Sequence, residues 1–400
     1  MIRVAEIDGG KVMRVRVRVL IAALLPLAAV VAIGPSAGAV AQARPTALSS
    51  SFSVSGRLDD VAALSPRSAW AVGASGVCRP RTLIARWNGS AWRAVQVPAG
   101  PRHGELYSVA ATSARDAWAA GFAGTNIGPA RALMLHWDGK AWKPVALPSG
   151  AGDVTLSGVA ATSARHAWAV GYSNGFTADF KAFVLQWDGR AWRRVRTPSP
   201  RGDILLSGVA ATSARNVWVV GTRVGRGVST GLILHWNGAA WTRVRLPALP
   251  PRVFLGRVAA ISARAAWVVG VTGSNKPLIL RWNGAAWRQV AVPGITGGLF
   301  AVTAVSARDA WAVGATRSLF AIACAGPTAR GAAATKIRPL IFHWNGTTWK
   351  PVTAPAQPDS AVLGAVAATS AGNAWAVGGL NYLRSSGKVL VLRWNGNAWR

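Results

Sequence analysis

Few side chains in this sequence could do acid–base chemistry. Its 400 residues include 13 acidic and 45 basic ones, a formal net charge of +32. The carboxylates Asp153 and Asp203 occupy matching places in two consecutive stretches of similar sequence. Glycoside hydrolysis needs two carboxyl groups about 5–9.5 Å apart. Asp153 and Asp203, in the connections between neighbouring units, are therefore the catalytic candidates. The other acids in turns and hairpins, Asp116, Asp138, Asp188 and Asp309, are turn formers.

Histidine offers no metal site in this sequence. His136, His235 and His343 each stand directly before a tryptophan, in similar stretches that are not consecutive. We expect equivalent side chains on separate units to point away from one another, so they cannot bind one metal ion. No nucleophile motif, phosphate-binding loop or metal-ligand spacing appears, and we expect no metal and no cofactor.

The two cysteines, Cys78 and Cys324, lie far apart in the sequence. Both fall in connections that we expect on one face of the molecule. Cysteine pairs in exported chains usually oxidise, so we predict a disulfide between them. The alternative is two free thiols.

An internal repeat organises most of the chain. Each unit has a Ser-Ala-Arg-x-Ala-Trp-Ala-Val-Gly half and a Trp-(Asn/Asp)-Gly-x-x-Trp half, and seven units account for all 21 tryptophans. The first tryptophans of the units are Trp70, Trp118, Trp168, Trp218, Trp267, Trp311 and Trp375. Since a ligand needs an asymmetric site, a sevenfold recurrence favours packing between units over sugar stacking.

The repeat predicts an all-β, seven-bladed β-propeller of four-stranded antiparallel blades. First tryptophans are spaced 44 to 64 residues apart, and Asn-Gly or Asp-Gly marks a hairpin in every unit. In the third unit we expect strands at 156–162, 167–172, 182–187 and 191–197. We expect the propeller at 44–400, closed by an N-terminal strand at 51–55 that completes the last blade. The expected blades are approximately 57–98, 106–148, 156–198, 206–247, 254–293, 299–353 and 363–400 plus 51–55.

The N-terminus has the layout of a secretory signal peptide at 1–43. Arginines precede an apolar run at 19–33, and small residues follow it up to Ala43. Met13 begins a more conventional signal than Met1. We expect export to the cell envelope or the medium, with no membrane span left after cleavage.

The repeats resemble those of secreted bacterial propeller proteins of the kelch and galactose-oxidase-like type. The resemblance rests on segments such as 163–171 and 185–192, and it covers residues 51–400. The hairpin at Asp188 is also similar to the Asp-box of sialidase-type propellers, without its leading Ser or Thr. The resemblance implies the fold rather than a particular activity, because propellers host many functions.

Deviations from the repeat point to a ligand face. The connections between second and third strands vary most, and binding residues concentrate in such loops on a rigid scaffold. The alternative is unselected drift of loop sequences. The predicted ligand-binding residues are Arg79, Arg81, Asn126, Tyr172, Asn174, Phe176, Lys181, Arg223, Arg226, Asn275, Lys276, Phe320, Arg330, Tyr382 and Arg384.

The charge indicates the class of partner. Removal of residues 1–43 leaves 40 basic and 11 acidic residues, a net charge of +29. A basic rim attracts polyanions, although a composition rich in arginine could equally carry no function. We therefore expect a monomeric, non-catalytic propeller that binds an anionic glycan, a wall polymer or a protein. A glycan-acting hydrolase or lyase and a structural or adhesive protein are the alternatives, and we expect no nucleic-acid partner after export.

Overall fold

Every regular element among the described residues is a β-strand. The computed structural model describes residues 54–76, 79–97, 103–124, 130–173, 180–198, 200, 202–225, 228–316, 336–381 and 387–400. None of these residues forms a helix that is long and apolar enough to cross a membrane.

The strands form seven sheets, one for each repeat of the sequence. Blade one contains β1 (Arg57–Ser65), β2 (Ser68–Ser75), β3 (Arg81–Trp87) and β4 (Trp92–Ala94). Blade two contains β5 (Gly104–Ser113), β6 (Asp116–Gly124), β7 (Ala130–Trp137) and β8 (Trp142–Pro144). Blade three contains β9 (Val154–Ser163), β10 (His166–Ser173), β11 (Lys181–Trp187) and β12 (Trp192–Arg194). Blade four contains β13 (Asp203–Ser213), β14 (Asn216–Val224), β15 (Ser229–Trp236) and β16 (Trp241–Arg243).

The remaining three blades follow the same order. Blade five contains β17 (Phe254–Ser262), β18 (Ala265–Val271), β19 (Pro277–Trp282) and β20 (Trp287–Val290). Blade six contains β21 (Gly298–Ser306), β22 (Asp309–Ala315), β23 (Pro339–Trp344) and β24 (Trp349–Pro351). Blade seven contains the three strands β25 (Ala361–Ser370), β26 (Asn373–Leu380) and β27 (Lys388–Trp394).

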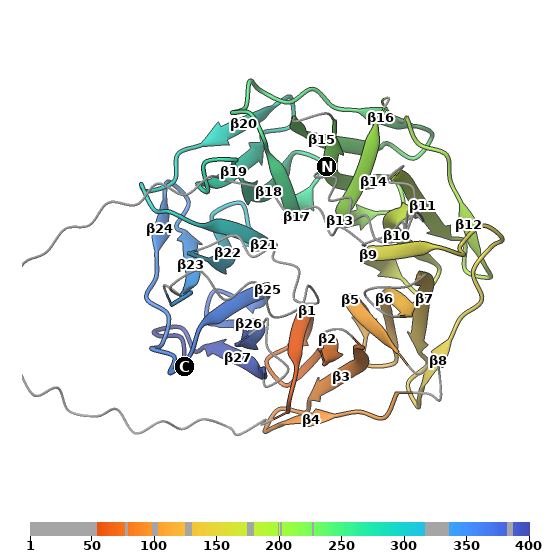
Figure 1. The fold of residues 1–400 in the computed structure, drawn as a ribbon, viewed down its shortest axis with the longest axis horizontal. Coiled ribbons are helices and arrows are strands. Elements are labelled where there is room, and N and C mark those ends of the chain that lie inside the picture. The colour runs from red at the N-terminus through yellow and green to blue at the C-terminus, as the bar shows by residue number, and fades with distance from the viewer. Residues whose placement is uncertain are drawn as a thin grey trace, which may run out of the picture.

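The blades surround a common axis, so the predicted seven-bladed propeller is confirmed (Figure 1). The first strand of each blade lies nearest the axis and the short fourth strand forms the outer wall. We call the end of the ring with the first-to-second and third-to-fourth turns the turn face. The opposite end, with the second-to-third loops and the connections between blades, is the loop face.

Both ends of the described chain complete blade seven. Trp399 bridges to Trp394, and Arg393 and Arg400 exchange backbone hydrogen bonds of 2.8 and 3.0 Å. Nearer the start of β27, Val389 N–H donates to the Val54 carbonyl at 3.0 Å. Alternate residues of a strand aim their N–H groups at the same edge, so both segments lie along the outer edge of β27. The N-terminal segment therefore pairs with the last blade as predicted; residues 51–53 of the expected strand lie outside the described residues.

The repeated glycine of the second strand has a steric cause. Each first strand shifts its register with the second strand just after a buried leucine, as at Leu106. A Cβ on Gly121 would overlap the Glu105 carbonyl oxygen of the neighbouring strand. The second strands of the other six blades have the same close approach. Only glycine fits, which explains the Trp-Ala-Val-Gly pattern.

The hairpins between third and fourth strands use the predicted Asn-Gly or Asp-Gly pairs. In blade one the Asn88 carboxamide oxygen accepts N–H bonds from Ser90 and Ala91 at 3.0 and 2.9 Å, and Gly89 has a φ of 99°. The fourth strands are shorter than predicted: in blade three β12 ends at Arg194 instead of 197. One more backbone bond, from Val195 to Val184, follows before the chain leaves the edge.

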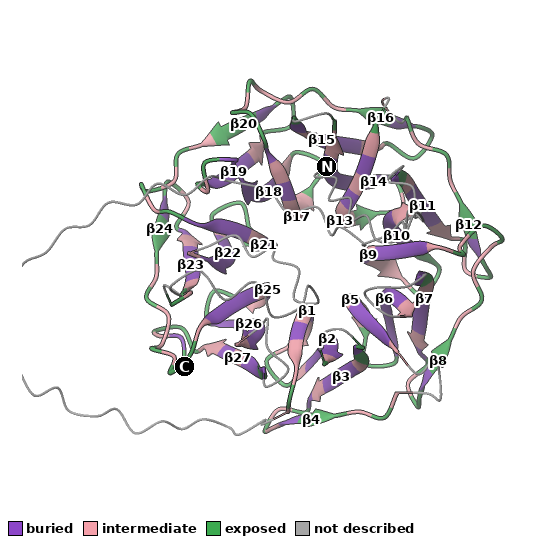
Figure 2. Ribbon diagram, in the orientation of Figure 1, coloured by how far each residue is buried: buried purple, intermediate pink, exposed green. Residues whose placement is uncertain are grey.

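The tryptophans form a continuous lattice between blades. In blade one, Trp70 packs against Trp137 and Trp142 of blade two, with ring centroids 4.9 and 5.1 Å apart. The same contact recurs at all seven junctions, the last being Trp375 of blade seven with Trp87 and Trp92 of blade one. The first and third tryptophans of every blade are buried, as in the purple parts of Figure 2, and the packing interpretation of the tryptophans is confirmed. The second tryptophans are buried or half-buried.

Candidate functional site

The first strands carry the strongest departures from the repeat near the axis. The residue that follows the buried leucine by two positions is small in five blades: Ser108, Gly158, Gly208, Ala301 and Ala365. Blade one has Asp60 there and blade five has Arg257. The two charged departures have opposite signs.

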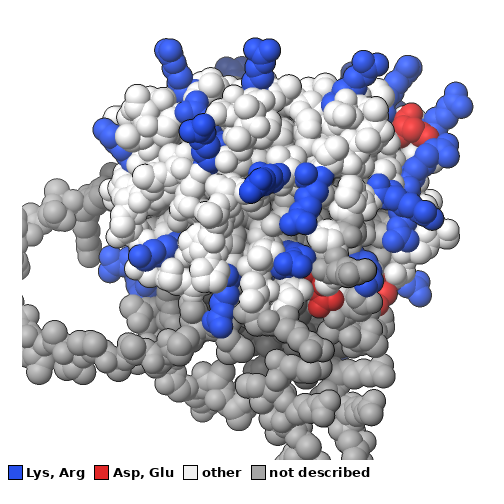
Figure 3. Space-filling view, turned by 90° about the horizontal axis from the view of Figure 1, so that it is seen from above, with Lys and Arg blue, Asp and Glu red and all other residues white. Residues whose placement is uncertain are grey.

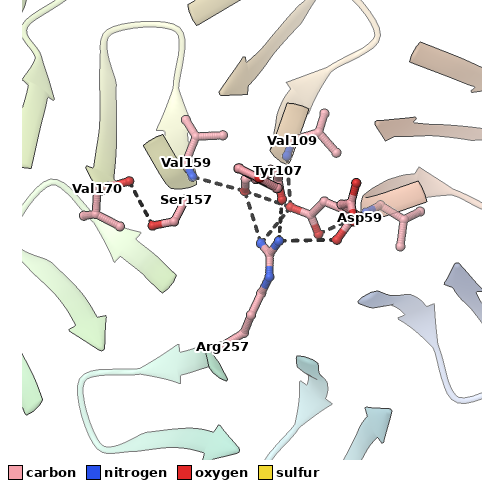
Figure 4. A network of polar contacts seen from close by, with 10 residues as sticks. Asp59, Tyr107, Val109, Ser157, Val159, Val170 and Arg257 are labelled. Carbon is pink, nitrogen blue, oxygen red and sulfur yellow. Dashed lines mark hydrogen bonds and ion pairs between the residues drawn. The ribbon is translucent and has the colours of Figure 1, made fainter. Parts of the chain in front are cut away.

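Asp60 and Arg257 meet across the ring. An Arg257 guanidinium nitrogen lies 2.8 Å from an Asp60 carboxylate oxygen, and the guanidinium also donates to the Asp59 and Tyr107 carbonyls at 3.4 and 2.5 Å (Figure 4). The same Asp60 oxygen accepts from the Ser108 hydroxyl at 2.8 Å. Blade five is thereby tied to blades one and two, which lie opposite it.

A second polar cluster sits beside this pair, where the first strands of blades one and two begin at the loop face. Arg57 donates a hydrogen bond to the Glu105 carboxyl group, and its Nε lies 3.5 Å from an Asp59 oxygen. The Glu105 residue is 0% exposed, and the Asp59 side chain is 9% exposed. Neither carboxyl group is open to a bound polymer, so this cluster is built to hold the two strands together.

Burial changes the protonation of this cluster. Burial raises the pKa of Glu105 to about 8, with Asp59 raising it further and the Arg57 charge opposing the change. The pKa of the Tyr107 hydroxyl is also raised, first by burial and then by Glu105. At neutral pH the cluster therefore retains a proton that an exposed carboxyl group would have lost.

The proposed catalytic candidates lie at the starts of neighbouring first strands. Asp203 is the first residue of β13, and one of its oxygens accepts the Phe180 N–H at 3.1 Å. This bond anchors the end of the second-to-third loop of blade three. Asp153, just before β9, has a φ of 56°, which suits a turn former. Catalysis by this pair stays a prediction.

The described part of the predicted ligand set lies where the sequence places it, at the loop-face end of the ring. Its members are Arg79, Arg81, Tyr172, Lys181, Arg223, Asn275 and Lys276. Tyr172 is half-buried and meets Phe180 edge-on at 5.7 Å. The members outside the described residues are Asn126, Asn174, Phe176, Arg226, Phe320, Arg330, Tyr382 and Arg384. Cys78 and Cys324 also lie outside them, so the disulfide stays a prediction.

The structure adds a ring of basic residues to this face. Six blades have an exposed lysine or arginine within one residue of the start of the third strand, and blade four has Thr230 in its place. The six are Arg81, Arg131, Lys181, Lys276, Arg338 and Lys388. Sequence reasoning selected Arg81, Lys181 and Lys276 and missed the others. Aligning the repeats at the apolar third strand would have found them.

A pocket of about 430 Å³ lies on blade four, between the start of β15 and the connection that follows β16. Leu246, Leu249 and Val253 contribute apolar surface, while Arg243 and Arg245 add positive charge. None of the predicted ligand residues lines it.

The three histidines of matching position serve the tryptophan lattice. His136 stacks on Trp118 at 4.2 Å and lies 2.7 Å from an Asp116 oxygen, and His235 and His343 repeat the arrangement. Burial lowers the pKa of His235. Among the described residues no group of three or more His, Cys, Asp or Glu side chains could hold a metal ion.

Basic side chains are scattered over the described surface in Figure 3, with few acidic side chains among them. Two acids at the hairpins form ion pairs within their own blades. Asp138 pairs with Lys143, and Asp188 with Arg193, each at 2.6 Å. The lysine or arginine hydrogen bond lowers the pKa of each of these carboxyl groups, and backbone N–H bonds lower it further. The basic residues thus dominate the field around the ring.

Comparison with known proteins identifies the architecture alone. No protein-family model matches the sequence, and no curated protein matches it. Among solved structures, YCF48 bound to D1 peptide has a TM-score of 0.53 at 12% identity, covering 85% of this chain and 92% of its own. The GH74 xyloglucanase from Xanthomonas campestris has a TM-score of 0.54 at 15% identity, covering 86% of this chain and 52% of its own.

A polysaccharide lyase of family PL25, an ulvan lyase bound to a sugar fragment, has a TM-score of 0.51 at 9% identity. The alignment covers 83% of this chain and 91% of the lyase. At such identities the likeness establishes the β-propeller fold and nothing narrower. The kelch and galactose-oxidase-like resemblance stays a prediction.

Proposed function

We propose that this propeller is a non-catalytic binding protein that holds an anionic polysaccharide on its loop face, at the cell envelope or outside it. The observation that carries the proposal is the ring of six exposed bases at the starts of the third strands. They stand one to a blade on a rigid scaffold. A long polymer with regularly spaced carboxylate or sulfate groups could contact several of them together.

The acids nearest the axis do not oppose such a ligand. Asp59 and Glu105 are buried against Arg57, and Asp60 is paired with Arg257. Tyr172 offers an aromatic edge close to the basic ring. Solved propellers of similar shape bind a peptide or a glycan, so a protein partner is the second candidate.

The test is binding of polygalacturonate, with neutral dextran as the uncharged control. We expect polygalacturonate to bind and the affinity to fall as salt rises, because exposed charges are screened beyond about 10 Å at 0.1 M salt. The triple variant Arg81→Gln, Lys276→Gln, Lys388→Gln should weaken binding roughly tenfold, at about 0.5 kcal/mol per exposed charge. Equal binding of dextran, or no effect of the triple variant, would contradict the proposal.

An enzymatic role has its own readout in the same samples. Release of shortened polygalacturonate that stops in Asp153→Asn or Asp203→Asn would replace the binding proposal with the glycan-acting alternative. We expect the polymer to stay intact.

A further inference from the structure

The turn face carries a second set of basic residues, and this set belongs to a different end of the ring. The turn between the first and second strands contains an exposed arginine in blades one to six, whereas blade seven has Gly372. The six are Arg67, Arg115, Arg165, Arg215, Arg264 and Arg308. We call them the arginine crown. Every turn of this face lies within the described residues.

Each arginine of the crown is held by the same local structure. The Arg115 N–H donates to the Ser113 hydroxyl at 3.1 Å, and the other five blades repeat this bond with the matching serine. The arginine stem lies over the hairpin glycine of its own blade: a Cβ on Gly139 would sit 3.1 Å from Arg115 Cβ. Such packing fixes the stem and leaves the guanidinium group in solvent.

Acidic residues do not neutralise the crown. The turn face has four acids, and each one has a partner within its own blade. Asp116 and Asp309 bind His136 and His343 at 2.7 and 2.8 Å, and Asp138 and Asp188 are paired with bases of the fourth strands. The exposed Lys140 and Arg190 add two more bases to this face.

The shape of the turn face selects the kind of partner. Two residues separate the first and second strands and four separate the third and fourth, so no long loop rises to wall a groove. The single large apolar side chain exposed on this face is Val305, at 36%. A broad end of a ring, with positive charges around it on short turns, matches a flat anionic surface better than a single polymer chain.

We propose that the arginine crown docks the propeller, turn face down, on a phospholipid bilayer rich in anionic headgroups. The contact is electrostatic, without insertion of apolar side chains. The loop face then points away from the bilayer. The inference stands independently of the polysaccharide proposal, because it uses other residues at the opposite end of the ring.

The test is co-sedimentation of the full chain with phosphatidylcholine vesicles that contain or lack phosphatidylglycerol. We expect binding that requires phosphatidylglycerol and weakens with salt. The crown variant Arg115→Gln, Arg165→Gln, Arg215→Gln keeps the stems and should lower the affinity on the order of a hundredfold. The loop-face variant Arg81→Gln, Lys276→Gln, Lys388→Gln removes the same charge and should bind like the wild type.

Three results would overturn the proposal. One is equal loss in both triple variants, which would mean that total charge alone drives binding. Another is crown-dependent binding of soluble polygalacturonate without binding to vesicles, which would assign the crown to a polymer chain. The third is binding that is equal on vesicles with and without phosphatidylglycerol, which would point to the apolar N-terminal run. An unchanged melting temperature of the crown variant confirms that the ring is intact.

Discussion

The contacts between blades and the strands around the axis follow opposite rules. At every junction one tryptophan meets two of the next blade, and the edge-on contacts span only 5.1 to 5.3 Å. Near the axis the matching positions differ in charge and size, and Asp60 finds Arg257 three blades away. Uniform junctions give the ring its shape. The matching positions of the first strands differ from blade to blade. The junctions and the first strands should therefore respond differently to substitution.

The largest effect is expected in the tryptophan lattice. Trp118→Ala and Trp218→Ala should each lower the free energy of unfolding by about 3–5 kcal/mol, because each removes a fully buried ring between two blades. Chemical denaturation should return similar values for the two sites. A difference of more than about 2 kcal/mol between them would break the uniformity of the junctions.

The tie across the axis should matter less and should depend on its partner. Arg257→Ala leaves the Asp60 carboxylate without its counter-charge and should cost roughly 2 kcal/mol, less than a fully buried pair because the arginine side chain is 21% exposed. Adding Asp60→Ala gives blade one the alanine of blades six and seven. The double variant should recover at least half of the loss; additive losses would show that the two residues act separately.

The cluster at Glu105 should make stability depend on pH. Its pKa is raised to about 8, so the folded state keeps a proton that the unfolded chain releases above its ordinary pKa near 4.5. Stability should fall as the pH rises between these values, by at most about 1.4 kcal/mol per pH unit. Thermal unfolding at pH 5 and pH 8 measures the fall, and Glu105→Gln should reduce it. The same slope in the variant would assign the dependence to other groups.

The smallest effect on stability is expected at the position beside the first tryptophan, where one blade has histidine and another has arginine. His235 lies over Trp218 and bonds to Asn216, whereas in blade seven Arg393 lies over Trp375 and donates to Asn373. His235→Arg would copy blade seven into blade four and should change the free energy of unfolding by less than about 0.5 kcal/mol. A cost above 1 kcal/mol in a denaturant titration would mean that this slot is not interchangeable.

Much of the scaffold could be predicted because the sequence repeats it seven times. The blade count, the hairpins and the role of the tryptophans all follow from matching positions, and so does the need for an N-terminal segment beside β27. The short fourth strands were not predicted. In blade three, Arg194 and Arg196 continue the alternating pattern of a strand, but β12 already ends at Arg194.

The polar network at the axis could not be predicted in the same way. Asp60 and Arg257 are 197 residues apart, and their meeting depends on how far the closed ring brings opposite blades together. Alignment of the repeats marks both as departures, but it cannot say that they are partners. For the loop face, the sequence found three of the six exposed bases because residues were chosen loop by loop and not by their matching position in the repeat.

The one-way contact of each tryptophan with the next blade makes the ring a chain of head-to-tail interfaces. Each blade uses its first tryptophan to contact the next blade and its second and third tryptophans to contact the previous one. A cyclic oligomer with heterologous contacts has the same arrangement. The seven blades of this single chain are therefore arranged like the seven subunits of a cyclic heptamer. The number of blades is set by the rotation from one interface to the next. The closing interface, between blades seven and one, uses the same tryptophan contact, and the N-terminal segment beside β27 adds to it.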